Sequence, residues 1–323
     1  MPSFLRLLSI SIVVCGFSVG CRPACAVIIY GGTSGRNLSA PTGAFQDSGW
    51  QYEGSWEVGA GTAISAKYFL TARHLGGAIG DEIVIQGVHY HAAQIIDDPA
   101  GSDVRMIQIQ ERFASYAPLY EKSDEVSGNK LLTVFGRGSD RGPTFTGPNG
   151  IQGYIWGGYD GQLSWGASRV AFATTITSGP AGDFLGAFFL ANPPVGVPTS
   201  STLSGGDSGG GVFIKDSDGK WKLAAVNYAV DGPYSLNPDA GYFNAAVFDT
   251  RNLYEGSPSD HILHPGGSTA TAQAWYASRV SEKVATIYGL TGVPEPSSFV
   301  LVAVGLAGLV AARFRSLSRR GAG

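Results

Sequence analysis

The sequence predicts one large all-β domain, and three observations support this fold class. The chain has 323 residues, 44% of them hydrophobic, which is enough to bury a sizeable core. It contains 47 glycines among many short runs rich in β-branched and aromatic residues, and it has few long helical patterns. All three cysteines, Cys15, Cys21 and Cys25, lie near the start, so core burial rather than a disulfide must stabilise the rest.

Residues 1–26 have the composition of a secretory signal peptide. Arg6 is followed by the apolar run from Leu7 to Gly20, and Ala24-Cys25-Ala26 has the small-x-small pattern of a cleavage site. The sequence therefore predicts export, with a mature chain that begins near Val27. A lipoprotein signal at Cys21 is the alternative.

The following segments alternate between apolar runs and turn residues. Strand-like runs precede and follow the main motifs, and the clearest are Tyr68–Ala72, Leu131–Gly136, Phe184–Leu190, Val212–Ile214, Trp221–Tyr228 and Gly241–Val247. A period of 3.6 residues, by contrast, predicts a helix over residues 271–288. The formal net charge of −3 and the lack of a basic patch exclude nucleic acid as a partner class.

The most informative stretch is Leu203–Gly211, which holds Gly206-Asp207-Ser208-Gly209-Gly210. Glycines on both sides of Asp207 and Ser208 allow a tight turn in which backbone N–H groups approach a bound group. A serine hydroxyl beside such amides has the features of an activated nucleophile next to an oxyanion hole. The alternative is an ordinary Gly/Ser turn, because short motifs also occur by chance.

This pentapeptide resembles the signature of chymotrypsin-like serine proteases, and two upstream segments extend the resemblance in the expected order. Tyr68–His74 is similar to the family's histidine segment, and Gly101–Ile107 is similar to its aspartate segment. The resemblance implies a double β-barrel over residues 27–290. Its parts would be barrel one at about 27–130, barrel two at about 131–255 and a C-terminal helix at about 271–288.

The resemblance also implies a role for each matching residue. Ser208 would be the nucleophile, His74 the general base, and Asp103 the carboxylate that orients His74. The N–H groups of Gly206 and Ser208 would form the oxyanion hole. Asp97 and Asp98 compete with Asp103, which is preferred because an apolar strand follows it directly.

Activation and specificity residues follow from the same resemblance. Ile29 would become the N-terminal residue whose ammonium group pairs with Asp207, although Ile28 stands where Arg or Lys is usual. An ordinary first strand is the alternative for this segment. The pocket for the residue before the scissile bond would include Thr202, Asn227 and Gly241. With Thr202 rather than Asp at the predicted pocket floor, the sequence predicts a preference for uncharged residues, unless Asp231 or Asp239 supplies the charge.

The C-terminal segment, residues 293–323, resembles a PEP-CTERM sorting signal. Pro294-Glu295-Pro296 precedes the apolar run Phe299–Ala312, and four arginines follow it. Such signals are recognised by an exosortase, so the resemblance implies a protein that is exported and transiently anchored in the inner membrane. Fourteen apolar residues are few for an independent membrane span, which needs about 20. A plain C-terminal anchor is the alternative.

Two other functions compete with a secreted serine endopeptidase that acts on peptides or proteins. A catalytically inactive homologue would serve as a matrix or binding protein. A zinc hydrolase would use histidines spread over two segments, namely His89, His91, His261 and His264. No third ligand motif accompanies these histidines, so neither a metal nor another cofactor is expected. The sequence leaves the natural substrate and the oligomeric state open.

Overall fold

A computed structural model describes residues 27–31, 35–177, 180–193 and 195–291. The predicted signal peptide and the C-terminal sorting segment from residue 292 onward lie outside these residues. The described chain consists mostly of β-strands, as the sequence predicts, with one α-helix near its end. Short 3₁₀ helices at Gly43–Phe45, Trp50–Tyr52, Arg73–Leu75 and Ser281–Lys283 complete the elements.

The first half forms a closed six-stranded barrel in the order β2-β3-β4-β7-β6-β5. Its strands are β2 (Glu53–Trp56), β3 (Gly59–Ala63), β4 (Tyr68–Ala72), β5 (Glu82–Ile85), β6 (Val88–Asp97) and β7 (Val104–Ile109). The pairing of Ser55 with Val84 closes the barrel. Apolar side chains from alternate strand positions fill its interior, among them the fully buried Trp56, Phe69 and Ile83.

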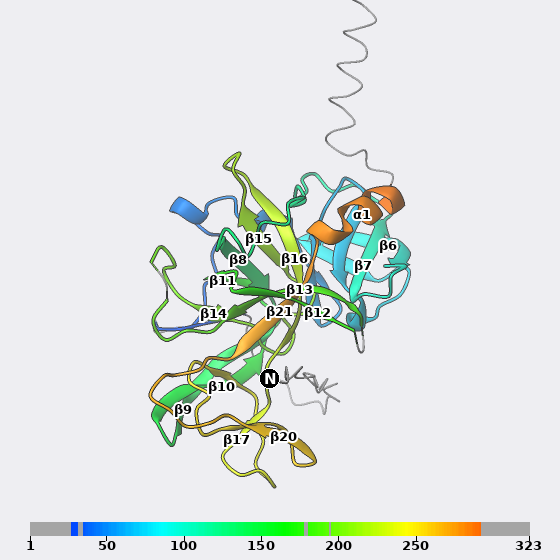
Figure 1. The fold of residues 1–323 in the computed structure, drawn as a ribbon. Helices are drawn as coiled ribbons and strands as arrows, with labels where there is room; N and C mark the ends of the chain where they lie inside the picture. Colours follow the sequence, from blue (N-terminus) through cyan, green and yellow to red (C-terminus); the bar gives the residue numbers. More distant parts are fainter. Residues whose placement is uncertain (1–26, 32–34, 178–179, 194, 292–323) are drawn as a thin grey trace, which may run out of the picture. The chain divides into compact units, whose positions relative to one another are not determined.

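The second half is built on a seven-stranded sheet in the order β11-β8-β15-β16-β21-β13-β12, whose strands can be followed in Figure 1. They are β8 (Leu131–Gly136), β11 (Ser164–Arg169), β12 (Phe172–Ile176), β13 (Gly182–Phe188), β15 (Gly211–Lys215), β16 (Trp221–Val230) and β21 (Ala274–Arg279). Val134, Val212 and Trp275 belong to the main core cluster of this half.

Three smaller sheets complete the second half. β1 (Ile28–Ile29) pairs with β14 (Ser201–Thr202). The other two sheets have the order β18-β10-β9 and β17-β19-β20. Their strands are β9 (Ser139–Gly147), β10 (Gly150–Tyr159), β17 (Tyr234–Ser235), β18 (Ala245–Val247), β19 (Tyr254–Ser257) and β20 (Asp260–Leu263). The described strands thus do not pair into the predicted second closed barrel, because the β9–β10 hairpin pairs with β18 instead of with the large sheet.

The prediction of a helix over residues 271–288 is wrong for the first part of this range. Residues 274–279 form β21, which lies between β16 and β13 and pairs with both. Both faces of β21 are buried, so its apolar residues do not alternate and the strand period is hidden in the sequence. The second compact unit of the chain begins at Lys283, and its described part contains α1 (Val284–Thr291). No described helix is long and apolar enough to cross a membrane.

Candidate active site

The three residues of the predicted triad lie in contact. Nδ1 of His74 lies 2.7 Å from Oδ2 of Asp103, and Nε2 of His74 lies 2.7 Å from Oγ of Ser208. The backbone N–H of His74 also donates to Oδ1 of Asp103 at 3.0 Å. Asp103 is only 2% exposed, whereas the His74 side chain is 40% exposed and accessible to a substrate.

Strand pairing explains why His74 meets Asp103. Ala72 at the end of β4 is the register partner of Val104 at the start of β7. The residues just outside this pair are therefore neighbours, and Arg73 N–H donates to the Asp103 carbonyl at 2.7 Å. The 3₁₀ turn Arg73–Leu75 then orients the imidazole ring toward Ser208. Asp97, one of the two competing aspartates, forms ion pairs with Arg73 and Arg105 instead.

The turn that carries Ser208 packs closely against the first barrel. Ala60 N–H donates to the Ser208 carbonyl at 2.9 Å, and Gly209 N–H donates to the Asn227 carbonyl at 3.0 Å. Gly209 has φ +81°, and a Cβ there would clash with the Ala60 carbonyl. A glycine is required at this position because a side chain would separate Ser208 from the barrel that holds His74.

The predicted oxyanion donors have no competing acceptor. Within the described residues, neither the Gly206 nor the Ser208 backbone N–H is bonded to another protein group. Gly206 has φ +97°, and a Cβ there would lie 2.7 Å from the Tyr159 ring. The ring of Tyr159 thus covers one side of this turn, and both N–H groups keep their capacity to bind a ligand oxygen.

Asp207 is fully buried and accepts several backbone hydrogen bonds. Its carboxylate accepts from the N–H groups of Val27 at 3.1 Å, Gly138 at 2.8 Å and Ser204 at 2.7 Å. Burial raises the pKa of Asp207 from 3.8 to about 6, and these hydrogen bonds oppose the increase. An ammonium group at one of these positions would stabilise the ionised carboxylate.

The expectation that Ile29 meets Asp207 is wrong by two residues. Ile29 pairs with Ser201 in the β1–β14 ladder, and its N–H donates to the Gly35 carbonyl at 2.9 Å. The same ladder brings Val27 to Asp207, where Val27 is completely buried. Val27 has φ +24°, a strained conformation for a β-branched residue inside a chain.

The residues predicted for the substrate pocket do not form one group. Asn227 is buried, and its Nδ2 donates to the carbonyls of Phe135 at 2.6 Å and Asp207 at 3.0 Å, so it holds the Ser208 turn and does not line a pocket. Gly241 is exposed and has φ +73°. Thr202 is fully buried, and its hydroxyl lies 3.4 Å from Oε1 of Gln273.

Two residues near these positions were not predicted from the sequence as parts of the site. Gln273 is buried, and its Nε2 donates to the carbonyls of Asp231 at 2.7 Å and Ala245 at 2.9 Å, which fixes its orientation toward Thr202. Tyr228 packs edge-on against His74, with ring centroids 5.9 Å apart. A lone Gln and a lone Tyr carry no local sequence signal, so only the fold identifies them.

Each of the four histidines considered for zinc has its own oxygen partner, which is a carboxylate or a backbone carbonyl. Nδ1 of His89 lies 2.7 Å from Glu82, and Nδ1 of His91 lies 2.8 Å from Glu111. His264 contacts Glu255, and His261 contacts the Ser257 carbonyl. In the described part of the chain, no group of three or more potential ligands is placed to hold a metal ion.

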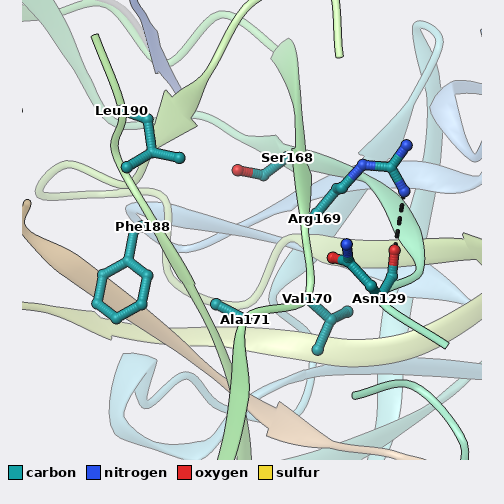
Figure 2. A pocket seen from close by; sticks show the side chains of 7 residues that line it. All are labelled: Asn129, Ser168, Arg169, Val170, Ala171, Phe188 and Leu190. Carbon is teal, nitrogen blue, oxygen red and sulfur yellow. Dashed lines mark hydrogen bonds between the residues drawn. The ribbon is translucent and has the colours of Figure 1, made fainter. Parts of the chain in front are cut away.

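A small cavity of about 110 Å³ lies outside the triad region (Figure 2). It is lined by Asn129, Ser168, Arg169, Val170, Ala171, Phe188 and Leu190. Arg169 donates to the Asn129 carbonyl at 2.8 Å across this cavity. None of the predicted site residues lines it, so it is separate from the candidate active site.

Comparison with known proteins identifies one segment. Residues 292–316 match the PEP-CTERM protein-sorting motif, while no curated protein matches the chain. The match agrees with the motif expected from Pro294-Glu295-Pro296 and its apolar run, and it implies recognition by an exosortase-type sorting enzyme. The chain therefore carries a PEP-CTERM sorting motif, which is typical of an exported protein that its C-terminal segment anchors in the membrane before sorting.

Proposed function

We propose that this chain is an exported serine endopeptidase. The observation that carries the proposal is the continuous set of contacts from Asp103 through His74 to Ser208, each 2.7 Å long. A buried carboxylate, a solvent-accessible imidazole and a serine hydroxyl in this order are the groups that nucleophilic acyl transfer requires. Two unpaired N–H groups beside the hydroxyl strengthen the argument.

The reaction proceeds through an acyl-enzyme. Ser208 Oγ attacks the peptide carbonyl carbon while its proton passes to Nε2 of His74, and Asp103 stabilises the resulting imidazolium. The Gly206 and Ser208 N–H groups hold the oxyanion. His74 then gives the proton to the leaving amine as the C–N bond breaks, and a water molecule deprotonated by His74 hydrolyses the ester.

Maturation at Val27 is part of this proposal. Cleavage after Ala26 would convert the Val27 N–H into an ammonium group 3.1 Å from Oδ1 of Asp207. An ammonium group at this distance offsets the cost of burying the Asp207 carboxylate. Cleavage also removes the strain at Val27, because an N-terminal residue has no φ angle. Removal of the signal peptide would then stabilise the Ser208 turn through Asp207.

The proposed relationship to chymotrypsin-like proteases rests on the placement of the candidate catalytic residues and not on a second closed barrel. The closed barrel supplies His74 and Asp103, and the second half supplies Ser208. The same division between two β units is implied by the sequence resemblance. The seven-stranded sheet replaces the second closed barrel in the described strands.

At the predicted floor of the pocket for the residue before the scissile bond, the fully buried Thr202 contacts the equally buried Gln273. Neither carries a charge. The Asp231 carboxylate, which could have supplied one, accepts from Ala274 N–H at 2.9 Å, and its pKa is raised to about 7 by burial. Such a pocket favours uncharged side chains, because a buried substrate cation would lack a carboxylate partner.

Labelling with a fluorophosphonate probe tests the proposed function. The probe reacts only with a serine that a neighbouring base activates, so the domain from Val27 to Leu290 should be labelled and its Ser208→Ala variant should not. An unlabelled wild-type domain that binds peptides without cleaving them would instead indicate the inactive homologue.

A further inference from the structure

Arg137 is a partly buried cation that has no carboxylate partner among the described residues. Its Nη1 donates to the Gly161 carbonyl at 2.7 Å, while its buried Nε has no acceptor. Nη2 has no acceptor in the described part of the chain and is not among the buried atoms, so it is open to solvent. Of the other partly buried arginines, Arg36, Arg105, Arg251 and Arg279 bind carboxylates, whereas Arg141 and Arg169 donate to backbone carbonyls.

No nearby side chain neutralises this cation near pH 7. Glu53 and Tyr159 are the groups whose charge acts on Arg137. Burial raises the pKa of Glu53 to about 8, so this carboxyl is mostly protonated at neutral pH. Burial also raises the pKa of the Tyr159 phenol, which stays neutral. A guanidinium keeps its proton throughout this range, so Arg137 has an uncompensated positive charge.

The position of Arg137 connects it to the Ser208 turn. The flanking residues Gly136 and Gly138 both pack against Asp207, and Gly138 N–H donates to its carboxylate at 2.8 Å. A Cβ on Gly206 would lie 3.0 Å from the Cα of Gly138. The backbone on both sides of Arg137 therefore lies directly behind the predicted oxyanion turn.

Tyr159 and Val58 form a wall beside this turn. The Tyr159 ring faces Gly206, and its hydroxyl donates to the Val58 carbonyl at 2.6 Å. Tyr228, in contrast, packs on His74 and Phe184. Tyr228 thus contacts the proposed general base, whereas the Tyr159–Val58 wall lies beside the oxyanion donor Gly206, on the side that the proposal below gives to the leaving group.

We propose that Arg137 binds a carboxylate of the substrate on the leaving-group side of the scissile bond. This proposal rests on the proposed peptidase function. The carboxylate belongs either to an acidic side chain one or two residues after the bond or to a free C-terminus close to it. The planar guanidinium, with Nη2 open to solvent, suits a carboxylate better than an ammonium group would.

The test compares matched peptides that differ only after the scissile bond, with Glu, Gln or Lys at the first or second position. We expect wild-type kcat/KM to be about tenfold higher for Glu than for Gln, in line with a charge-assisted hydrogen bond. Arg137→Gln should bring this ratio close to one, and Arg137→Lys should retain part of it. Arg169→Gln is the matched control, because Arg169 donates only to the carbonyls of Asn129 and Val195.

Two further experiments complete the test. The first identifies which carboxylate of the substrate is bound, and the second tests the anion site independently of the proposed peptidase function. Peptides with an amidated C-terminus show whether a side chain or the terminal carboxylate is bound. Calorimetric binding of the same peptides to Ser208→Ala measures the Glu:Gln preference without turnover, so the anion site is tested even if the wild type cleaves nothing. Equal affinity for Glu and Gln peptides, or a ratio that Arg137→Gln leaves unchanged, would overturn the assignment.

Discussion

The backbone nitrogen of Val27 lies 3.1 Å from Oδ1 of Asp207, in a site from which water is excluded. Asp207 directly precedes Ser208, and its other partners are the N–H groups of Gly138 and Ser204. An ammonium group at residue 27 would therefore act on the same turn that presents the proposed nucleophile and the proposed oxyanion donors. The proposed removal of residues 1–26 would therefore affect the geometry of the site through one carboxylate.

A protein that begins at Val27 should be more active than one that retains Ala26. In the longer protein, residue 27 offers an amide instead of an ammonium group, so ionised Asp207 is poorly compensated. The pKa of Asp207 is raised from 3.8 to about 6, so the longer protein should lose stability as pH rises through this interval, by about 3 kcal/mol in total.

Peptide hydrolysis and denaturant unfolding from pH 4 to pH 7 measure both effects. The control is the protein that begins at Val27 and carries Ile29→Val. This change alters the packing of β1 but not the contact with Asp207, because the Ile29 N–H donates to the Gly35 carbonyl. Equal activity of the two chain lengths, with the same pH dependence of stability, would refute the link.

Glu53 should destabilise the protein at alkaline pH. It is the first residue of β2 and is buried, and it accepts from the Thr62 hydroxyl at 2.6 Å and from Gly211 N–H at 3.2 Å. Burial raises its pKa from 4.5 to about 8, so the folded state binds this proton more tightly than the unfolded state. Stability is therefore lost as pH rises between these values, by about 1.4 kcal/mol per pH unit.

Glu53→Gln should remove this part of the pH dependence and leave the variant more stable than wild type above pH 8. Urea unfolding from pH 5 to pH 9 measures the difference. The exposed Glu82, changed to Gln, is the control. Parallel stability curves for Glu53→Gln and wild type would mean that Glu53 is ionised in the folded protein.

Cleavage should occur mainly after uncharged residues. Thr202 and Gln273 at the predicted pocket floor are buried and uncharged, and the Asp231 carboxylate accepts from Ala274 N–H. A peptide library with all residues before the scissile bond measures the preference. Thr202→Asp should raise cleavage after Lys and Arg relative to other residues, whereas Thr202→Val should not. Dominant cleavage after Lys or Arg by the wild type would contradict the proposed pocket.

The PEP-CTERM motif at residues 292–316 should keep the full-length protein with the membrane until the segment is removed. The four arginines that follow its apolar run, Arg313, Arg315, Arg319 and Arg320, should hold that end in the cytoplasm. Changing them to Glu should therefore disturb orientation and sorting. Fractionation of cells that also produce an exosortase-type enzyme checks this prediction. Unchanged sorting of the Glu variant would count against the assignment.

Short-range patterns made part of the site predictable from the sequence. His74, Asp103 and Ser208 each lie beside a strand end or a glycine turn, and their flanking residues carry the signal. The contact of Asp207 with Val27 instead of Ile29 depends on the register between Ile28 and Thr202. No local pattern encodes a pairing between strands so far apart in the chain, so the expected position was two residues too late.

Tertiary pairing also explains the differences in the fold. Trp275 and Tyr276 belong to β21, which is buried on both faces between β16 and β13, and a strand of this kind shows no period of two. The sequence likewise offered no reason to propose a role for Arg137, because its lack of a carboxylate partner among the described residues is a property of the folded neighbourhood and not of the segment Gly136–Gly138.

The central claim is that Asp103, His74 and Ser208 act as one catalytic unit. Ser208→Ala, His74→Ala and Asp103→Asn should each lower kcat by about 10³-fold or more, and the double variants should lose little further activity. Circular dichroism should show that all three keep the fold, because His74 is partly exposed and the changes are small.

Hydrolysis of a peptide library by the purified Val27–Leu290 domain, compared with its Ser208→Ala variant, tests this claim most directly. We expect cleavage by the wild type and none by Ser208→Ala, and the two proteins should unfold at the same temperature within error. Cleavage by Ser208→Ala at the wild-type rate would contradict the mechanism, and a folded wild-type domain that cleaves no peptide would contradict the proposed function.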